Sequence, residues 1–165
     1  MSQAQTRPAP DSETAFQMDQ PLPPGMNILI VDDNAQNLEL LQAYLEDLNC
    51  PIRLAHDGLE AIAAVDAQQP DIILLDVMMP RMSGFQACAK LKSNPATRDI
   101  PIVMVTALNE VGDVERAVDS KADDFLTKPV NKLELVTRVR SLLRLRALKR
   151  EHDRALEQIK KLRGS

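Results

Sequence analysis

Aromatic residues are nearly missing from this chain of 165 residues: they make up 2% of it, and tryptophan is absent. Because 44% of the residues are nevertheless apolar, any core must be built from aliphatic side chains. Cysteine is equally scarce. Cys50 and Cys88 fit no metal-ligand spacing, and we expect them to pack as small apolar residues in a reducing compartment. A cysteine-based metal site is therefore not expected.

Long apolar runs are also lacking. No stretch is long and apolar enough to span a membrane, and residues 1–25 lack the apolar centre of a signal peptide. We therefore expect a cytoplasmic protein that has no membrane contact. Residues 1–25 hold five of the eleven prolines, are mostly polar and show no periodicity. This composition predicts a disordered leader.

The net charge of -4 conceals an asymmetry. From Arg138 to the end there are ten basic and three acidic residues, whereas the rest of the chain is strongly acidic. A basic tail is one signal of nucleic-acid binding. Here, however, the basic residues alternate with leucines at helical spacing, which favours a solvated helix face. We do not expect nucleic acid as a partner.

Five short aliphatic runs alternate with segments of helical periodicity. The runs predicted as strands are residues 27–31, 51–55, 71–76, 100–105 and 124–127. The segments predicted as helices are residues 38–48, 59–67, 83–93, 111–118 and a last one that starts near 131. This alternation predicts an α/β fold, a parallel sheet with helices on both faces.

Polar residues stand where the predicted strands end. Right-handed crossovers bring the carboxyl ends of parallel strands to one edge, where open α/β sheets bind ligands. The residues at these ends are Asp32, Asp33, Asp76, Thr106 and Lys128. Each alone has an ordinary explanation, such as a helix cap, a good strand residue or a surface charge. Their coincidence at one edge favours a functional site.

The chemistry that these groups suit is phosphoryl transfer to a carboxylate. Clustered carboxylates repel one another unless a cation neutralises them, and Mg²⁺ accepts such oxygen ligands together with a carbonyl and waters. Asp76 is then placed to attack phosphorus as an aspartyl nucleophile. Lys128 and the metal can neutralise the oxygens of the transferring group, and the Thr106 hydroxyl can donate to one of them.

The chain resembles the receiver domain of bacterial two-component response regulators, of the chemotaxis-regulator type, over about residues 27–143. The motifs that carry the resemblance are Val31 to Asn34, Asp57-Gly58, Leu75 to Gly84, Val105 to Ala107 and Phe125 to Pro129. The resemblance implies a doubly wound, flavodoxin-like five-stranded parallel sheet of strand order 2-1-3-4-5, followed here by an extended C-terminal helix. It also implies a regulatory phosphoacceptor domain and not an enzyme with its own substrate.

The same resemblance implies a role for each matching residue. Asp76 is the phosphoacceptor, which receives the phosphoryl group from a histidine kinase or a phosphotransfer protein. The implied ligands of Mg²⁺ are Asp32, Asp33, Asp76 and the backbone carbonyl of Met78. Thr106 and Lys128 contact the phosphoryl group, and Phe125 is the switch aromatic coupled to Thr106. The implied output surface consists of the fourth helix, the fifth strand and the fifth helix.

One position departs from the family pattern. Lys121 stands where the family usually has the glycine that closes the preceding helix in a left-handed conformation. A lysine makes that cap less favourable, so we expect an altered end of the fourth helix. This departure bears on the geometry of the output surface, whose change the sequence does not define, and not on the phosphorylation chemistry.

The last helix has two parts. Up to residue 143 its apolar positions should pack on the sheet, which bounds a receiver domain at residues 26–143. Residues 144–165 form an extension whose coiled-coil seam comprises Leu145, Leu148, His152, Ala155, Ile159 and Leu162. Two successive spacings of three, from Leu142 to Leu148, break the register. We predict a homodimer through this helix. Similar helices connect receivers to output domains, so either a C-terminal output domain is missing from this chain or the helix is itself the output.

Two other functions remain open. Metal-dependent phosphatases of the haloacid-dehalogenase type also use an aspartyl nucleophile, but they carry a second Asp two residues later, where this chain has Met78. Their nucleophile also follows the first strand, whereas here the acidic pair comes first. A dimerisation scaffold that works without phosphorylation is the other alternative, and the intact set of polar strand ends argues against it.

Overall fold

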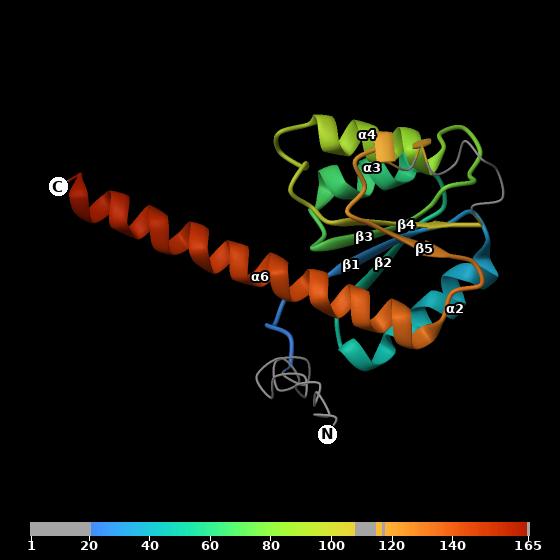
Figure 1. Cartoon of the computed structure of the whole chain (residues 1–165), viewed down its shortest axis with the longest axis horizontal. Coiled ribbons are helices and arrows are strands. Elements are labelled where there is room, and N and C mark those ends of the chain that lie inside the picture. Colours follow the sequence, from blue (N-terminus) through green and yellow to red (C-terminus); the bar gives the residue numbers. More distant parts are fainter. Residues whose placement is uncertain (1–20, 108–114, 117, 165) are drawn as a thin grey trace, which may run out of the picture.

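Five parallel strands form a single sheet in the order β2-β1-β3-β4-β5, as predicted (Figure 1). The structure, a computed structural model, describes residues 21–107, 115–116 and 118–164. The strands are β1 (Ile28–Val31), β2 (Ile52–Ala55), β3 (Ile72–Asp76), β4 (Ile102–Thr106) and β5 (Asp124–Thr127). Their parallel register places the carboxyl ends of β1, β3, β4 and β5 along one edge.

Helices cover both faces of the sheet. On one face lie α3 (Gly58–Ala67) and α4 (Gly84–Ser93), and on the other α2 (Ala35–Leu45) and α6 (Lys132–Arg163) (Figure 1). A short 3₁₀ turn, η1 (Glu46–Leu48), follows α2. Most of the helix predicted at 111–118, and residues 1–20 of the predicted leader, lie outside the described residues. None of the described helices is long and apolar enough to cross a membrane.

The core is aliphatic, as the scarcity of aromatic residues requires. In β1, Ile28 and Ile30 face the layer of α2 and α6, whereas Leu29 and Val31 face the layer of α3 and α4. All four side chains are at most 1% exposed. A strand buried on both faces in this way is typical of a parallel sheet between two helical layers. Because the strands are held rigidly between these layers, the sheet also determines the positions of the polar residues at the strands' carboxyl ends.

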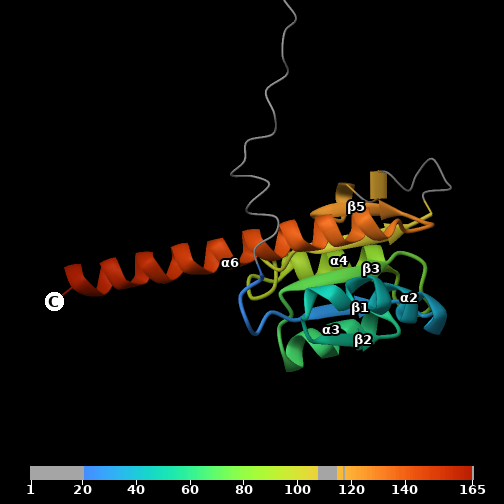
Figure 2. The ribbon, with the colours of Figure 1, turned by 90° about the horizontal axis from the view of Figure 1, so that it is seen from below.

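The helix α6 continues far beyond the sheet (Figure 2). Past its buried stripe, basic side chains fasten it to the amino-terminal edge of the sheet. Arg146 Nη1 donates to the Asp99 carbonyl at 3.0 Å, and Lys149 Nζ lies 3.3 Å from Asp99 Oδ1. Arg150 Nη1 lies 2.6 Å from Oδ1 of Asp71, a carboxylate that is 1% exposed. Part of the basic face that we predicted as solvated thus anchors the helix, and residues 151–164 are exposed.

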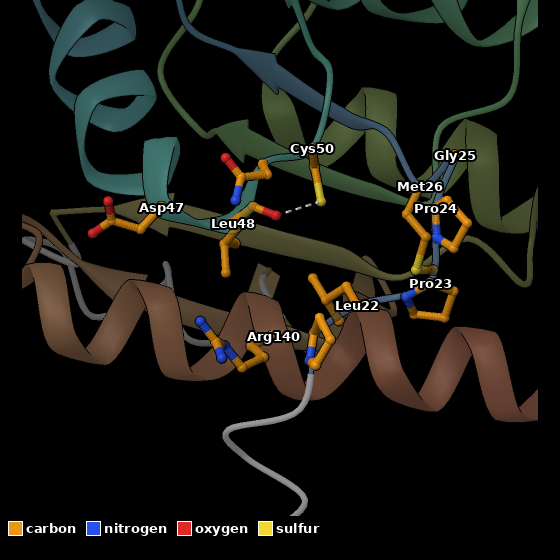
Figure 3. A pocket seen from close by; sticks show the side chains of 11 residues that line it. Leu22, Pro23, Pro24, Gly25, Met26, Asp47, Leu48, Cys50 and Arg140 are labelled. Atoms are coloured by element: carbon orange, nitrogen blue, oxygen red, sulfur yellow. Dashed lines mark hydrogen bonds between the residues drawn. The ribbon is translucent and has the colours of Figure 1, made fainter.

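Residues 21–26 precede β1 and lie beside η1 and α6. Leu22 packs against the cluster of Met26 and Leu48, and these residues line a hollow of about 320 Å³ together with Cys50 and Arg140 (Figure 3). The Cys50 thiol donates to the Leu48 carbonyl at 3.5 Å. This hollow adjoins the starts of β1 and β2, so it lies at the opposite edge from the predicted site.

Lys121 adopts the left-handed conformation in spite of its Cβ. Its φ is 62°, and its N–H donates to the Val118 carbonyl at 3.1 Å. The end of this helix thus has the left-handed backbone that the usual glycine would adopt, although lysine, which carries a Cβ, occupies the position. A left-handed residue that carries a Cβ costs about 1–2 kcal/mol.

We predict that Lys121→Gly stabilises the protein, because glycine adopts this φ without the steric penalty. The free energy of unfolding should rise by about 1 kcal/mol, as measured by urea denaturation. The control is Lys90→Gly, at an exposed position inside α4, where glycine should lower stability by about 1 kcal/mol. Equal losses in both variants would show that the backbone at Lys121 is unstrained.

Candidate functional site

Three carboxylates meet at the carboxyl-terminal edge of the sheet. Asp32 and Asp33 follow β1, and Asp76 ends β3. Each offers an oxygen, and these oxygens lie within 4.8 Å of one another. Asp32 is 1% and Asp76 is 3% exposed, whereas Asp33 is exposed. The structure thus brings together the acidic residues predicted from separate parts of the chain.

One ammonium group lies among these carboxylates. Lys128 Nζ is 3.0 Å from Asp76 Oδ1 and 3.9 Å from Asp32 Oδ2. Lys128 follows β5, and its backbone N–H donates to the carbonyl of Thr106 at the end of β4, at 2.9 Å. The pairing of the last two strands therefore determines where the ammonium lies. Among the described residues, this single positive charge leaves the three carboxylates only partly neutralised.

The pKa of Asp76 is raised, and burial is the main cause. The hydrogen bond from Lys128 acts in the opposite direction, and the charges of Asp32 and Asp33 raise the pKa further. An acid whose pKa rises on folding makes the folded protein less stable as the pH increases through that pKa. A bound cation offsets this penalty, because it favours the charged form.

The donor set fits Mg²⁺. All three side chains offer oxygen, which this hard cation prefers, and oxygens around Mg²⁺ lie roughly 3–4 Å apart. The observed spread of up to 4.8 Å needs only small side-chain rotations to reach that geometry. Met78, whose carbonyl the resemblance adds to the set, lies two residues after Asp76 with its side chain 77% exposed.

Local capping leaves the acidic pair available. The Asn34 side chain accepts hydrogen bonds from the N–H groups of Gln36 and Asn37, at 2.9 and 3.2 Å, and so caps α2. Asp32 Oδ1 accepts from the Asn34 N–H at 2.8 Å, which orients that carboxylate. Asn34 therefore serves as the cap, the function that could otherwise have explained Asp32 or Asp33.

Gly84 fixes the loop that follows Asp76. A Cβ on Gly84 would lie 2.2 Å from the Asp76 carbonyl oxygen, so no larger residue fits without a backbone shift. Its N–H donates to the Val77 carbonyl at 2.9 Å. The loop after β3 thus returns closely to its own start. The sequence marked Gly84 as part of a motif, but the reason for the glycine is visible only in the structure.

The two predicted switch residues lie on neighbouring strands. Thr106 is 3% exposed at the end of β4, which pairs with β5. Phe125 of β5 is half-buried and packs against the cluster beneath α3 and α4. Its register partner on β4 is Met104, two residues before Thr106. The two residues thus lie on paired strands, near the carboxyl ends of β4 and β5.

Two further residues near the site had no predicted role. Asp57 caps α3 by accepting the Glu60 N–H at 2.8 Å, and it is paired with Arg81 of the loop after β3. Asp57 had been noted only as part of a motif. The preference for Asp before a helix could have indicated the cap. No local pattern indicates the ion pair, because its partners are 24 residues apart in the sequence.

The comparisons with known proteins agree with this geometry. Residues 28–140 match the family model described as the response regulator receiver domain, and the chain belongs to that family. Members of the family are, in general, regulatory phosphoacceptor domains of two-component systems that work with histidine kinases or phosphotransfer proteins.

Two curated relatives illustrate the range of the family. The response regulator PleD of Caulobacter vibrioides is 50% identical over 119 residues, which cover 72% of this chain and 26% of PleD. The DNA-binding dual master transcriptional regulator RpaA of Synechocystis is 42% identical over 117 residues, 71% of this chain and 48% of RpaA. The chain thus spans about a quarter to a half of these relatives.

Solved structures show the same fold. A receiver domain of a histidine kinase from Syntrophus aciditrophicus is 37% identical with a TM-score of 0.70, over 72% of this chain and 90% of that one. The receiver domain of the sensor histidine kinase PA1611 from Pseudomonas aeruginosa is 30% identical with a TM-score of 0.67, over 72% and 98%. The latter has a magnesium ion coordinated in its active site cleft.

We predict that Asp33→Asn weakens Mg²⁺ binding at least about tenfold, because it removes a charged oxygen ligand. Calorimetric titration with Mg²⁺ measures this loss. The metal-free melting temperature should stay equal or rise, since one of three neighbouring like charges is gone. Asp66→Asn on α3, an exposed carboxylate away from the site, is the control. Unchanged affinity in Asp33→Asn removes this residue from the ligand set.

Proposed function

We propose that this chain is a phosphorylation-activated switch of a two-component phosphorelay. It accepts a phosphoryl group on Asp76 from a histidine kinase or a phosphotransfer protein, with Mg²⁺ held by Asp32, Asp33, Asp76 and the Met78 carbonyl. The observation that carries the proposal is the arrangement of Asp76 at a buried strand end, 3.0 Å from the Lys128 ammonium and beside two further carboxylates. The magnesium ion in the Pseudomonas neighbour supports the metal.

The proposed reaction uses each of these groups. A carboxylate oxygen of Asp76 forms a bond to phosphorus while the bond from phosphorus to the donor's imidazole nitrogen breaks, and that nitrogen retains the bonding electrons. The Lys128 ammonium, which pairs with the Asp76 carboxylate before the reaction, can pair with an oxygen of the incoming phosphoryl group after it. The Thr106 hydroxyl can donate a hydrogen bond to another of these oxygens. Mg²⁺, when bound, neutralises negative charge on the carboxylates and the phosphoryl oxygens.

The position of Met78 argues against a phosphatase with its own substrate. A haloacid-dehalogenase type of enzyme needs a second carboxyl two residues after the nucleophile as general acid. Met78 occupies that place, and its thioether carries no titratable proton. Water activation after the first transfer would therefore lack its usual acid and base. This favours a domain that holds the phosphoryl group as a signal.

The proposed output runs from Thr106 and Phe125 to the last helix. On phosphorylation Thr106 moves toward the phosphoryl oxygens and Phe125 turns inward. The surface formed by the helix predicted at residues 111–118, by β5 and by the C-terminal helix then changes. In α6, Leu143 is fully buried and Leu145 is 63% exposed, and Ala147 still packs against the core, so the proposed register break lies in the last part of the helix that contacts the domain. The phosphoryl group can bias this helix only through different interactions with its two arrangements.

Asp76→Asn should abolish phosphorylation and keep the fold, because the amide cannot form the acyl phosphate. The measurement is intact-protein mass spectrometry after incubation with acetyl phosphate and Mg²⁺, with circular dichroism to verify folding. Asp66→Asn should be labelled like the natural protein. Undiminished labelling of Asp76→Asn would refute Asp76 as the acceptor.

We further predict a homodimer through the seam of α6, whose Ile159 and Leu162 are 48% and 78% exposed. Ile159→Gln should weaken dimerisation, because it places an amide in an apolar seam. Glu157→Gln, on the opposite side of the helix, is the matched control. Analytical ultracentrifugation with and without beryllofluoride should show that activation moves the dissociation constant roughly 5- to 150-fold, if affinity is the output. Monomers in every condition would disprove this dimer.

A further inference from the structure

The loop between β3 and α4 contains a residue in an unfavourable backbone conformation. Arg81 has a φ of 66°, in the left-handed region that residues with a Cβ rarely occupy. Its Nη2 lies 2.5 Å from Asp57 Oδ2, in an ion pair that joins this loop to the start of α3. A contact that persists together with a disfavoured φ indicates that the surrounding structure holds the loop in place.

Asp57 is a firm attachment point for this contact. Its side chain is 6% exposed, and its other oxygen, Oδ1, accepts the Glu60 N–H at 2.8 Å as the cap of α3. Its carbonyl accepts the first hydrogen bond of that helix, from Ala61 at 3.0 Å. The carboxylate is thus oriented by the helix before it meets Arg81, whose side chain is 69% exposed.

A second contact holds the loop between β3 and α4 against the start of α3. A Cβ on Gly58 would lie 2.8 Å from the Cβ of Met82 and 2.9 Å from its carbonyl oxygen, so the two backbones approach as closely as glycine permits. Within the loop, the Met82 N–H donates to the Pro80 carbonyl at 2.7 Å. The middle of the loop is therefore held from α3, while Gly84 holds its far end against β3.

We propose that the Asp57–Arg81 pair positions the loop that carries the Met78 carbonyl, and so sets the affinity of the site for Mg²⁺. Arg81 is three residues after Met78, and the intervening residues leave little freedom once Arg81, Met82 and Gly84 are fixed. Neither member of the pair touches the metal in this proposal. It rests on the proposed function, because that function supplies the metal and the Met78 carbonyl as its ligand.

The experiment is a double-mutant cycle read by calorimetric titration with Mg²⁺ alone. Asp57→Asn keeps an oxygen for the α3 cap but removes the charge, and Arg81→Gln removes the guanidinium. Each should weaken Mg²⁺ binding about tenfold, in the range typical of residues that orient metal ligands. The double variant should be no weaker than either single variant, because both remove the same interaction. Metal-free melting temperatures should change little.

Two further variants separate the ion pair from other causes. Arg81→Gly removes the pair and also relieves the left-handed strain, so it should bind Mg²⁺ as weakly as Arg81→Gln. Arg98→Gln, an exposed arginine beyond α4, should bind like the natural protein. Natural affinity in Arg81→Gln, or losses that add in the double variant, would overturn this inference alone. A natural protein that fails to bind Mg²⁺ would overturn the proposed metal site as well.

Discussion

The crowding of three carboxylates around one ammonium group is the constraint on which the rest of this structure depends. Asp76 is buried at the end of a central strand, and burial together with its acidic neighbours raises its pKa. Lys128 offsets part of that charge at 3.0 Å. In the described part of the chain, the folded protein thus maintains a site whose negative charge is only partly neutralised, as the proposed binding of a cation and a phosphoryl group requires. The aliphatic core provides the rigid frame that keeps these like charges together.

Several other elements position the residues at this edge of the sheet. The parallel register aligns the strand ends, the Asn34 cap frees the acidic pair, and Gly84 returns the next loop to Asp76. At the opposite edge, Asp71 and Asp99 fasten α6 through its basic residues. The helix is thus attached to the domain at this edge and exposed beyond it, over residues 151–164, as the proposed output through the last helix requires.

Much of this arrangement could be predicted from the sequence, because apolar runs mark the strands and parallel topology brings their polar ends together. The contacts between distant loops could not be predicted. Nothing local pairs Asp57 with Arg81, or Asp71 with Arg150, and the basic tail looked like a solvated face. The cost of a lysine at position 121 was predictable, but not that the chain would keep the left-handed backbone there, with the Lys121 N–H bonded to Val118.

The most direct test of the incomplete-charge account is to locate the phosphoryl group in the natural protein with and without the cation. The protein is incubated with acetyl phosphate in Mg²⁺ or in chelator, and peptide mass spectrometry maps the modified residue. The account predicts modification at Asp76 alone in Mg²⁺ and almost none in chelator, because the under-neutralised carboxylates repel the anionic donor. Equal modification in both conditions, or modification at a residue outside this edge of the sheet, would contradict it.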